Sequence, residues 1–384
     1  MSRFIAVFLS TYLTMHLFVY FRVRPLLPAR GPARWILAFC LLAMTAGPLL
    51  TRLLEMRGRD AAARVLGFIA FNWMGIVFLA FCSFLLAGAC DLILWPAEAF
   101  TRIRIPSLHE KFPTIAILLF VAALSVYSFL EARSLRIERV RIESGKLPSS
   151  TERLKIVQIS DLHLGLLNRD GRIKTILERI RAEAPDLVVS TGDLVDGNVE
   201  SLHHLEDIFR KVEAGLGKFA VTGNHEAYAG LDASVALTGS FGFTVLRGEA
   251  RTIGSIINIV GVDDPVFGGR EEESRLLSSL QNGLFTLLLK HRPEISEESP
   301  GLFDLQLSGH THRGQIYPFK FVVALQYPLM DGLYRLAKGS ILYASRGTGS
   351  WGPQMRLFSP PELTVIELTR PGAPPSGDVE ASLS

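Results

Sequence analysis

Cysteine is scarce in this chain and confined to one part of it. The 384 residues contain three cysteines, Cys40, Cys82 and Cys90, so none lies beyond residue 90. The later part of the chain therefore forms no disulfide and offers no thiolate nucleophile or thiolate metal ligand. The redox compartment is left open, because a domain without cysteine folds in either environment.

A strong positive charge is also missing. The formal net charge is +3, and no basic run is interleaved with aromatic residues, so we expect no nucleic-acid partner. The glycine-rich segment from Arg346 to Gly352 lacks the Gly-Lys-Ser/Thr ending of a P-loop. We interpret it as a turn that borders a functional site.

Charged residues are absent from four long stretches of the first third of the chain: Phe4–Phe21, Trp35–Thr51, Val65–Cys90 and Phe112–Leu130. A helix needs roughly 17–25 residues to cross the hydrocarbon core, so residues 1–132 are predicted to form a membrane region with about four transmembrane helices. A soluble helical bundle is the alternative, although its helices would usually carry a polar stripe. A signal peptide at the first stretch would need a compact basic region and a small-residue cleavage site, and neither is visible. His16, Asn72 and Cys90 are expected to make interhelical hydrogen bonds or to lie at the interface, rather than to mark a transport path.

The lysine and arginine residues that flank the four stretches bear on the orientation of the chain. With four spans, the N-terminus, the second loop and the C-terminal domain share a side. That side carries nine such residues: Arg3, Arg52, Arg57, Arg59, Arg64, Arg133, Arg136, Arg139 and Arg141. The other side carries seven: Arg22, Arg24, Arg30, Arg34, Arg102, Arg104 and Lys111. This bias favours an inner or plasma membrane protein whose C-terminal domain is cytoplasmic.

The remainder of the chain has the pattern of an α/β domain. Residues 133–150 are predicted to be a linker and a leading edge strand, residues 151–369 a folded domain, and residues 370–384 a disordered tail rich in Pro, Gly and Ser. Strands at Lys155–Ile159, Asp186–Ser190 and Lys218–Thr222 alternate with helical patterns, which implies a parallel core. More strands and fewer helices follow, at Phe243–Leu246, Ile256–Val260, Leu284–Lys290, Asp304–Ser308, Ile341–Ala344 and Leu363–Leu368. Two packed sheets with helices outside accommodate both halves.

Five short segments of this domain carry most of its chemistry: SDLHLG, STGDLVDG, VTGNHE, LLLKHRP and SGHTHRGQ. Most of them follow an apolar, β-branched run, so they lie where strands end and loops begin, which is where layered α/β folds assemble their sites. They supply a donor set for two metal ions: Asp161, His163, Asp193, Asn224, His291, His310 and His312. Gly192 and Gly223 are expected to permit tight turns, and the two-residue spacing of Asp161 and His163 to put both side chains on one face.

The donor types indicate the chemistry. Imidazoles with one amide suit zinc, iron or manganese better than calcium. A carboxylate such as Asp193 has two oxygens and can be shared between two cations. Two such ions held by only two carboxylates leave an excess of positive charge, which an anionic phosphate ester requires, and paired metals can activate a bridging water for in-line displacement.

Two further residues are candidates for acid catalysis. His225, beside Asn224, can protonate a leaving oxygen, and Asp196 can orient its imidazole. Glu226 is the alternative acid, although it is expected to point away. Arg313 and Arg346 are candidates for contacts with the substrate phosphate. His203 and His204 are expected to be solvated on a helix surface, and His109 to be exposed or structural in a loop.

These segments resemble the sequence blocks of the calcineurin-like metallophosphoesterases, in order and over about residues 150–370. The HTHRGQIYP stretch and the apolar N-terminus resemble the bacterial membrane-anchored branch. The resemblance implies a four-layer α/β/β/α sandwich with a dinuclear site. One metal would take Asp161, His163, Asp193 and His312, the other would take Asp193, Asn224, His291 and His310, and His225 with Asp196 would be the acid pair. Arg313 stands where many relatives are expected to have a small residue.

The leading hypothesis is a membrane-anchored, two-metal phosphoesterase that cleaves phosphodiester or pyrophosphate bonds. Relatives that cleave UDP-2,3-diacylglucosamine make a lipid-linked substrate one possibility, and a soluble nucleotide or phosphodiester is the other. A non-enzymatic membrane sensor or scaffold is the alternative from another class. Loss of a ligand would have favoured it, and all seven are in the sequence. The sequence leaves the oligomeric state open.

Overall fold

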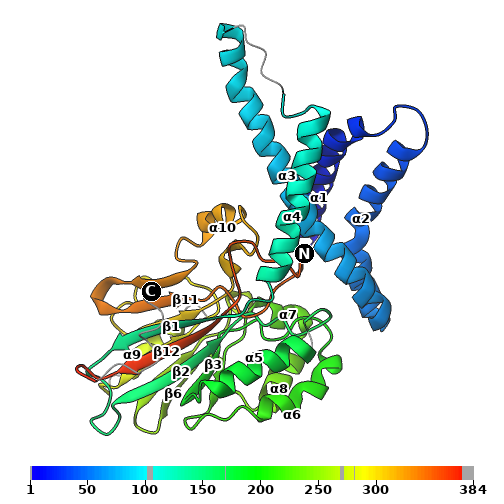
Figure 1. Ribbon diagram of the computed structural model, residues 1–384. Coiled ribbons are helices and arrows are strands. Elements are labelled where there is room, and N and C mark those ends of the chain that lie inside the picture. The colour runs from blue at the N-terminus through cyan, green and yellow to red at the C-terminus, as the bar shows by residue number, and fades with distance from the viewer. Residues whose placement is uncertain (1, 102–106, 169, 269–271, 281, 374–384) are drawn as a thin grey trace. The chain divides into compact units, whose positions relative to one another are not determined.

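The computed structural model describes residues 2–101, 107–168, 170–268, 272–280 and 282–373 (Figure 1). Arg102 and Arg104 of the charge comparison, and residues 374–384 of the predicted tail, lie outside the described residues. The chain divides into two compact units. The helical unit comprises Met1–Leu130 with Gly352–Leu357. The second unit comprises Glu131–Trp351 with Phe358–Ser384, and we call it the catalytic unit because it carries the predicted site residues.

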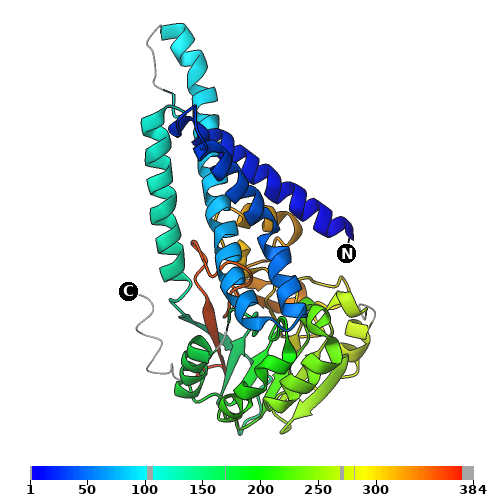
Figure 2. The ribbon, with the colours of Figure 1, turned by 90° about the vertical axis from the view of Figure 1, so that its right-hand side faces the viewer.

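The helical unit contains four helices that are long and apolar enough to cross a membrane. They are α1 (Ser2–Val23), α2 (Ala33–Met56), α3 (Asp60–Thr101) and α4 (Lys111–Glu131), with a short 3₁₀ turn η1 (Arg24–Leu26) after α1. Figure 2 shows them as long helices coloured from dark blue to teal. Large apolar side chains such as Trp35 and Phe39 are more than two-thirds exposed, which suits lipid and not water. The four predicted helices are confirmed.

Small and polar side chains connect these helices. A Cβ atom at Gly47 of α2 would come within 2.7 Å of the Ala70 Cβ of α3, the close approach that small residues allow between membrane helices. The Trp73 indole of α3 donates a hydrogen bond to His16 Nε2 of α1 at 3.0 Å. The interhelical bonding predicted for His16 is therefore present.

The segment Gly352–Leu357 belongs to the helical unit although it comes late in the sequence. The Gln354 N–H donates to Asn72 Oδ1 of α3 at 2.8 Å, and the Arg356 N–H donates to the Ser128 carbonyl of α4 at 3.0 Å. Met355, Arg356 and Leu357 are all buried. Asn72 thus bonds to a late segment of the chain, a partner that helical periodicity alone does not reveal.

The catalytic unit is built on two six-stranded sheets. The first has the order β1-β12-β2-β3-β4-β5, and β2 to β5 run parallel. Its strands are β1 (Arg136–Glu143), β2 (Arg153–Ile159), β3 (Leu187–Ser190), β4 (Lys218–Ala220), β5 (Thr244–Val245) and β12 (Glu362–Thr369). The second has the order β10-β11-β9-β8-β7-β6. Its strands are β6 (Glu249–Ile253), β7 (Ile257–Gly261), β8 (Phe285–Leu289), β9 (Leu305–Ser308), β10 (Gly332–Arg335) and β11 (Ile341–Ala344).

Alternation along the strands separates two hydrophobic cores. Leu187 and Val189 of β3 face the core between the two sheets, whereas Val188 faces the helices, as the two-residue period of a strand requires. Helices α5 (Asp170–Ala182), α6 (Glu206–Arg210) and α8 (Leu231–Ser240) cover the first sheet, and α9 (Glu272–Ser278) packs on the second through Leu277 (Figures 1 and 2). The predicted four-layer α/β/β/α sandwich is confirmed, with the leading strand β1 at the edge of the first sheet.

Three details differ from the sequence expectation. The strands expected at Phe243–Leu246 and Leu363–Leu368 join the first sheet, because β5 follows the α8 crossover and β12 inserts between β1 and β2. The helix expected at Val199–Ala214 is a 3₁₀ segment, η2 (Val199–Leu205), followed by the short α6. Strands β6 and β10 were not anticipated, because their exposed residues interrupt the apolar pattern.

Candidate metal centre

The five chemistry-bearing segments meet at one edge of the sandwich. Strands β2, β3 and β4 run parallel in the first sheet, and β8 and β9 run parallel in the second. Each is followed within a few residues by predicted donors, so the carboxyl ends of these strands bring the segments together. The side chains that gather there are Asp161, His163, Asp193, Asn224, His291, His310 and His312, and all are buried except the half-buried His310.

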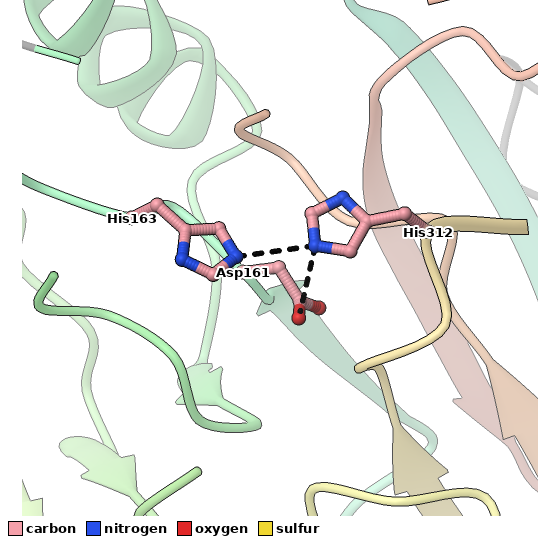
Figure 3. A group of neighbouring side chains, drawn as sticks. All are labelled: Asp161, His163 and His312. Carbon is pink, nitrogen blue, oxygen red and sulfur yellow. Dashed lines mark hydrogen bonds and ion pairs between the residues drawn. The ribbon is translucent and has the colours of Figure 1, made fainter. Parts of the chain in front are cut away.

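Asp161, His163 and His312 form a first cluster (Figure 3). His312 Nε2 lies 3.1 Å from His163 Nε2 and 3.4 Å from Asp161 Oδ1. The two Asp161 oxygens also accept the backbone N–H of His310, each at 3.0 Å. One carboxylate therefore contacts one candidate donor and fixes the backbone of another.

Asp193, His291 and His310 form a second cluster. Asp193 Oδ2 lies 3.2 Å from His291 Nε2, which lies 3.1 Å from His310 Nδ1. His291 Nδ1 lies 2.8 Å from the Thr191 carbonyl, which makes it the protonated ring nitrogen and leaves Nε2 as a donor atom for a cation. The Tyr327 hydroxyl lies 3.2 Å from His310 Nε2 and holds that ring in position.

Asp193 faces both clusters. Its Oδ2 atom is 3.2 Å from His291 of the second cluster and 3.9 Å from His163 of the first. His225 Nε2 lies 4.0 Å from the same oxygen, so His163, Asp193 and His225 make a third group of donors. This position suits a ligand shared between two cations.

The donor geometry fits metal ions. Four donors at the roughly 2.0–2.1 Å typical of zinc–nitrogen bonds lie roughly 3.3 Å apart in a tetrahedron, and the contacts within the two clusters range from 3.1 to 3.4 Å. Asn224 Oδ1 is buried and has no hydrogen-bond partner among the described residues. A buried oxygen without a partner is costly, and a cation would satisfy it.

The backbone of the donor loops is unusual. Asp161, His163, Asp193, His310 and His312 have φ values between 47° and 70°, in the left-handed region that non-glycine residues seldom adopt and that is enriched at functional sites. Asp161 and His163 do converge on His312, but strand alternation is not the reason. Their left-handed backbone turns the side chains inward after β2 has ended.

The two glycines before Asp193 and Asn224 act differently. Gly192 has a φ of 93°, so it permits the tight turn that the sequence analysis expected. Gly223 has an ordinary φ of −110°, and the turn explanation is wrong for it. A Cβ atom there would lie 2.2 Å from Asp193 Oδ1, so glycine is required by the close approach of this carboxylate.

His225 and Asp196 lie beside the clusters. His225 Nδ1 is 3.0 Å from Asp196 Oδ1. Burial opposes a charge on the ring, but Asp193 and Asp196 outweigh it and raise the pKa of His225 to about 9. The ring packs edge-on against Tyr228 at 5.3 Å and Trp351 at 5.6 Å, both about half exposed. The predicted acid pair is therefore in contact and lies next to an exposed aromatic rim.

The charged groups of the clusters shift one another's pKa values. Burial favours the neutral acid, yet the neighbouring histidines hold the pKa values of Asp161 and Asp193 well below their usual range. Burial likewise opposes charge on His291, but Asp193 raises its pKa to about 10. Burial and the His291 charge lower the pKa of His310 to about 3.

Glu226 has a role that sequence reasoning missed. It is the third residue of α7 (Asn224–Ala229) and is buried. Its carboxylate accepts the backbone N–H groups of Gly223 at 2.7 Å, Val195 at 3.0 Å and Asp193 at 3.1 Å. Glu226 therefore points away from the clusters, as expected, and holds two donor loops together. An acidic residue at the third position of a helix was the available signal.

The remaining candidates have structural partners. Arg346 forms ion pairs with Glu138 and Glu362 and is largely buried, so it is held within the protein and not presented to a phosphate. Arg313 pairs with Asp331 at 3.0 Å. In the loop expected to border the site, the Gly349 N–H donates to the Asp161 carbonyl at 3.1 Å, which confirms that border.

The other histidines lie outside the clusters. His203 is exposed and pairs with Glu206, and His204 is exposed, as predicted. His109 contacts Asp91 within the helical unit, as expected of a structural loop residue.

Comparison with known proteins agrees with this geometry. Residues 154–314 match the family model of the calcineurin-like phosphoesterases. An uncharacterized metallophosphoesterase of Aquifex aeolicus is 40% identical over 261 residues, which cover 66% of this chain and 100% of that protein. One of Bacillus subtilis is 34% identical over 253 residues, covering 62% and 87%. A protein of Danio rerio named as a transmembrane protein with a metallophosphoesterase domain is 31% identical over 280 residues, covering 66% and 62%. The chain belongs to the calcineurin-like metallophosphoesterases, a family of phosphoric ester hydrolases that use divalent metals, and it carries four apolar helices before its catalytic unit.

Proposed function

We propose that this chain is a membrane-anchored phosphoesterase that uses two metal ions to hydrolyse phosphodiester or pyrophosphate bonds. One ion takes Asp161, His163, Asp193 and His312, and the other takes Asp193, Asn224, His291 and His310. The observation that carries the proposal is the position of Asp193, whose Oδ2 atom faces imidazoles of both clusters. Manganese, iron and zinc are the ions that suit this mixture of imidazole, carboxylate and amide donors.

Two bound ions supply Lewis acidity for the phosphate and an activated water for its displacement. The residues of the chain orient the metal donors and supply a proton to the leaving oxygen. Thr191 and Tyr327 fix the His291 and His310 rings, and Glu226 fixes the loops of Asp193 and Asn224. These contacts hold the donors in place before a substrate arrives, which lowers the reorganisation needed during the reaction.

His225 is the proposed general acid. Its Nδ1 faces Asp196, so its Nε2 is the atom that can donate a proton to a leaving oxygen. Asp193 and Asp196 outweigh the effect of burial and raise the pKa of His225 to about 9 in the metal-free protein. Tyr228 and Trp351 flank the ring and are the side chains that a leaving group would meet first.

The proposed substrate is lipid-linked, such as UDP-2,3-diacylglucosamine, and the catalytic unit is proposed to face the cytoplasm. Four residues, Ala132 to Leu135, separate α4 from β1, so the tether keeps the unit close to the bilayer. The orientation rests on the nine lysine and arginine residues on one side against seven on the other. We propose residues 1–132 as the membrane region, 133–150 as linker and leading strand, and 151–369 as the phosphoesterase domain.

A soluble nucleotide or phosphodiester is the second candidate substrate. The observation in favour of a nucleotide is that the exposed rings of Tyr228 and Trp351 can stack on a base. A non-enzymatic sensor or scaffold is the alternative from another class, and the clusters of candidate metal donors argue against it.

The deciding experiment uses the full chain in lipid nanodiscs, stripped of metal and reloaded with manganese, iron or zinc. Turnover is measured against bis-p-nitrophenyl phosphate, nucleotides and UDP-2,3-diacylglucosamine. We expect metal-dependent hydrolysis that chelator abolishes, and preference for the lipid-linked substrate. Full activity after chelation, with no transition metal bound, would refute the metal assignment. A C-terminal reporter that is active only outside the cytoplasm tests the orientation, and its activity would exclude cytoplasmic lipid precursors as substrates.

A further inference from the structure

An exposed apolar surface surrounds α10 (Lys320–Gln326) in the catalytic unit. We call it the α10 patch and define it by six residues: Tyr317, Phe319, Phe321, Val322, Leu325 and Phe358. Leu325 is 87% exposed, and Phe321 and Val322 are more than half exposed. We propose that the α10 patch inserts into the headgroup boundary of a phospholipid bilayer and forms a second membrane contact, separate from the four apolar helices.

The patch is one surface and not scattered side chains. The rings of Tyr317 and Phe321 lie 5.5 Å apart, and those of Tyr317 and Phe358 lie 5.8 Å apart. Leu325 follows Phe321 by four residues in α10, so the two side chains share a face of the helix. Residues far apart in the sequence thus combine into a single aromatic and aliphatic face of the kind that interfacial segments present to lipid.

The charge around the patch suits phospholipid headgroups. No acidic residue occurs between Thr311 and Met330. The Lys320 ammonium lies over the Tyr317 ring at 5.7 Å and over the Phe321 ring at 5.3 Å. A lysine that lays its stem along aromatic rings and keeps its charge at their edge can reach phosphate groups above an apolar layer.

The connections of the chain favour a bilayer over other occupants. The chain segment from Glu131 at the end of α4 to Arg136 at the start of β1 spans at most about 18 Å when it is fully extended. Phe358 directly follows Leu357, the last residue of the late segment in the helical unit. Within that unit the Arg356 N–H bonds to the Ser128 carbonyl near the end of α4. A residue of the patch is therefore tied by a very short stretch of chain to the end of a predicted membrane helix.

The patch is also fixed to the metal centre. Tyr327, which follows α10, is buried, and its hydroxyl lies 3.2 Å from His310 Nε2. Thr311, between the donors His310 and His312, donates to the Met330 carbonyl at 2.7 Å. An α10 patch in the headgroup layer would hold the donor segment beside lipid phosphates. This consequence rests on the proposed function, whereas the membrane contact itself does not.

The contact is tested by spin labels in the full chain. The native Cys40, Cys82 and Cys90, all in the helical unit, are replaced by Ser, and single labels are introduced at Val322→Cys and Leu325→Cys. Val266→Cys is the matched control, because Val266 is a similarly exposed valine in the catalytic unit that does not belong to the patch. The proteins are reconstituted in vesicles of phosphatidylcholine and phosphatidylglycerol, and label collisions with oxygen and with a water-soluble nickel chelate are compared.

We expect the labels at 322 and 325 to collide preferentially with oxygen, as lipid-immersed labels do, and the label at 266 to collide with the nickel chelate. Equal nickel accessibility at all three positions would overturn the proposal. Spectral broadening at 322 that disappears on dilution with unlabelled chain would also overturn it, because the patch would then face a second copy of this chain.

A kinetic measurement connects the contact with the reaction. Val322→Asp is expected to lower kcat/KM for a vesicle-embedded phosphoester by about tenfold, since an exposed apolar group that the proposal places in lipid is replaced by a charge. Val266→Asp should leave it unchanged, and both variants should hydrolyse bis-p-nitrophenyl phosphate at the wild-type rate. An equal loss on both substrates would mean that α10 supports the metal centre only. Labels immersed in lipid on a chain that hydrolyses no phosphoester would contradict the proposed function and leave the membrane contact standing.

Discussion

The carboxylate of Asp193 accepts the backbone N–H of His225 through Oδ1 at 2.8 Å, while its Oδ2 faces the imidazole of His291 at 3.2 Å. One side chain thereby joins the two parts of the candidate site, the metal donors and the acid. Asp193 is buried and follows a glycine with a left-handed backbone. Its position is fixed by the fold and not by solvent-exposed contacts. A substitution of Asp193 should therefore alter both the binding of the two ions and the position of His225.

Asp193→Asn should remove more activity than any other single ligand substitution. An amide offers one oxygen in place of two and carries no charge, so neither ion keeps its shared anionic donor. We expect metal analysis to show a loss at both positions, whereas Asn224→Ala should reduce occupancy at one. Asp193→Asn with two bound ions and near-normal turnover would show that the carboxylate is not shared.

His225→Ala should lower turnover by roughly 10²–10⁴-fold while the metal content stays near wild type, as expected for the loss of a general acid. The loss should be smaller for nitrophenyl esters, whose leaving group needs no proton, than for alkyl esters. His225 Nε2 lies 4.0 Å from Asp193 Oδ2 and belongs to a group of candidate donors. Loss of metal in His225→Ala, or equal losses on both kinds of ester, would make it a ligand or a structural residue.

Glu226→Gln should destabilise the catalytic unit although it removes no donor. The carboxylate accepts three backbone N–H groups, and a glutamine amide would direct its own NH₂ group at one of them. Leaving a buried donor unsatisfied costs about 1–3 kcal/mol, to be measured as the change in the free energy of unfolding of the full chain in mild detergent. Glu178→Gln, at an exposed position of α5, is the control. Unchanged stability in Glu226→Gln would mean that the three contacts are replaceable.

Metal binding to the metal-free protein should release protons at neutral pH. Asp193 raises the pKa of His291 to about 10, so this ring is charged at pH 7 and must lose a proton before it can bind a cation. His310, with a pKa near 3, is already neutral and contributes none. The apparent affinity should therefore rise by about tenfold per pH unit for each displaced proton until the pH reaches about 10. Calorimetry in buffers of different ionisation enthalpy counts the protons, and a count of zero at pH 7 would contradict this account.

Much of the site was predictable from the sequence because its donors follow strands directly. Apolar runs such as β2 and β3 are recognisable by composition, and the carboxyl ends of parallel strands meet at one edge. The sequence therefore predicts that Asp161, Asp193 and Asn224 lie near one another. The four apolar helices are equally predictable from the sequence, since length and lack of charge are sufficient to predict them.

Other features were decided only by the tertiary structure. The packing of the two sheets brings the donor loops into close contact. This contact accounts for the positive φ of Asp161 and His163, the lack of space for a side chain at Gly223 and the hydrogen bonds that Glu226 accepts from backbone N–H groups. The same holds for Phe358, whose ring meets Tyr317 across about forty residues of sequence. Local sequence determines which residues end a strand or enter a membrane, because those preferences act over a few neighbours. It does not determine which distant side chains meet, because that depends on how the whole chain closes its core.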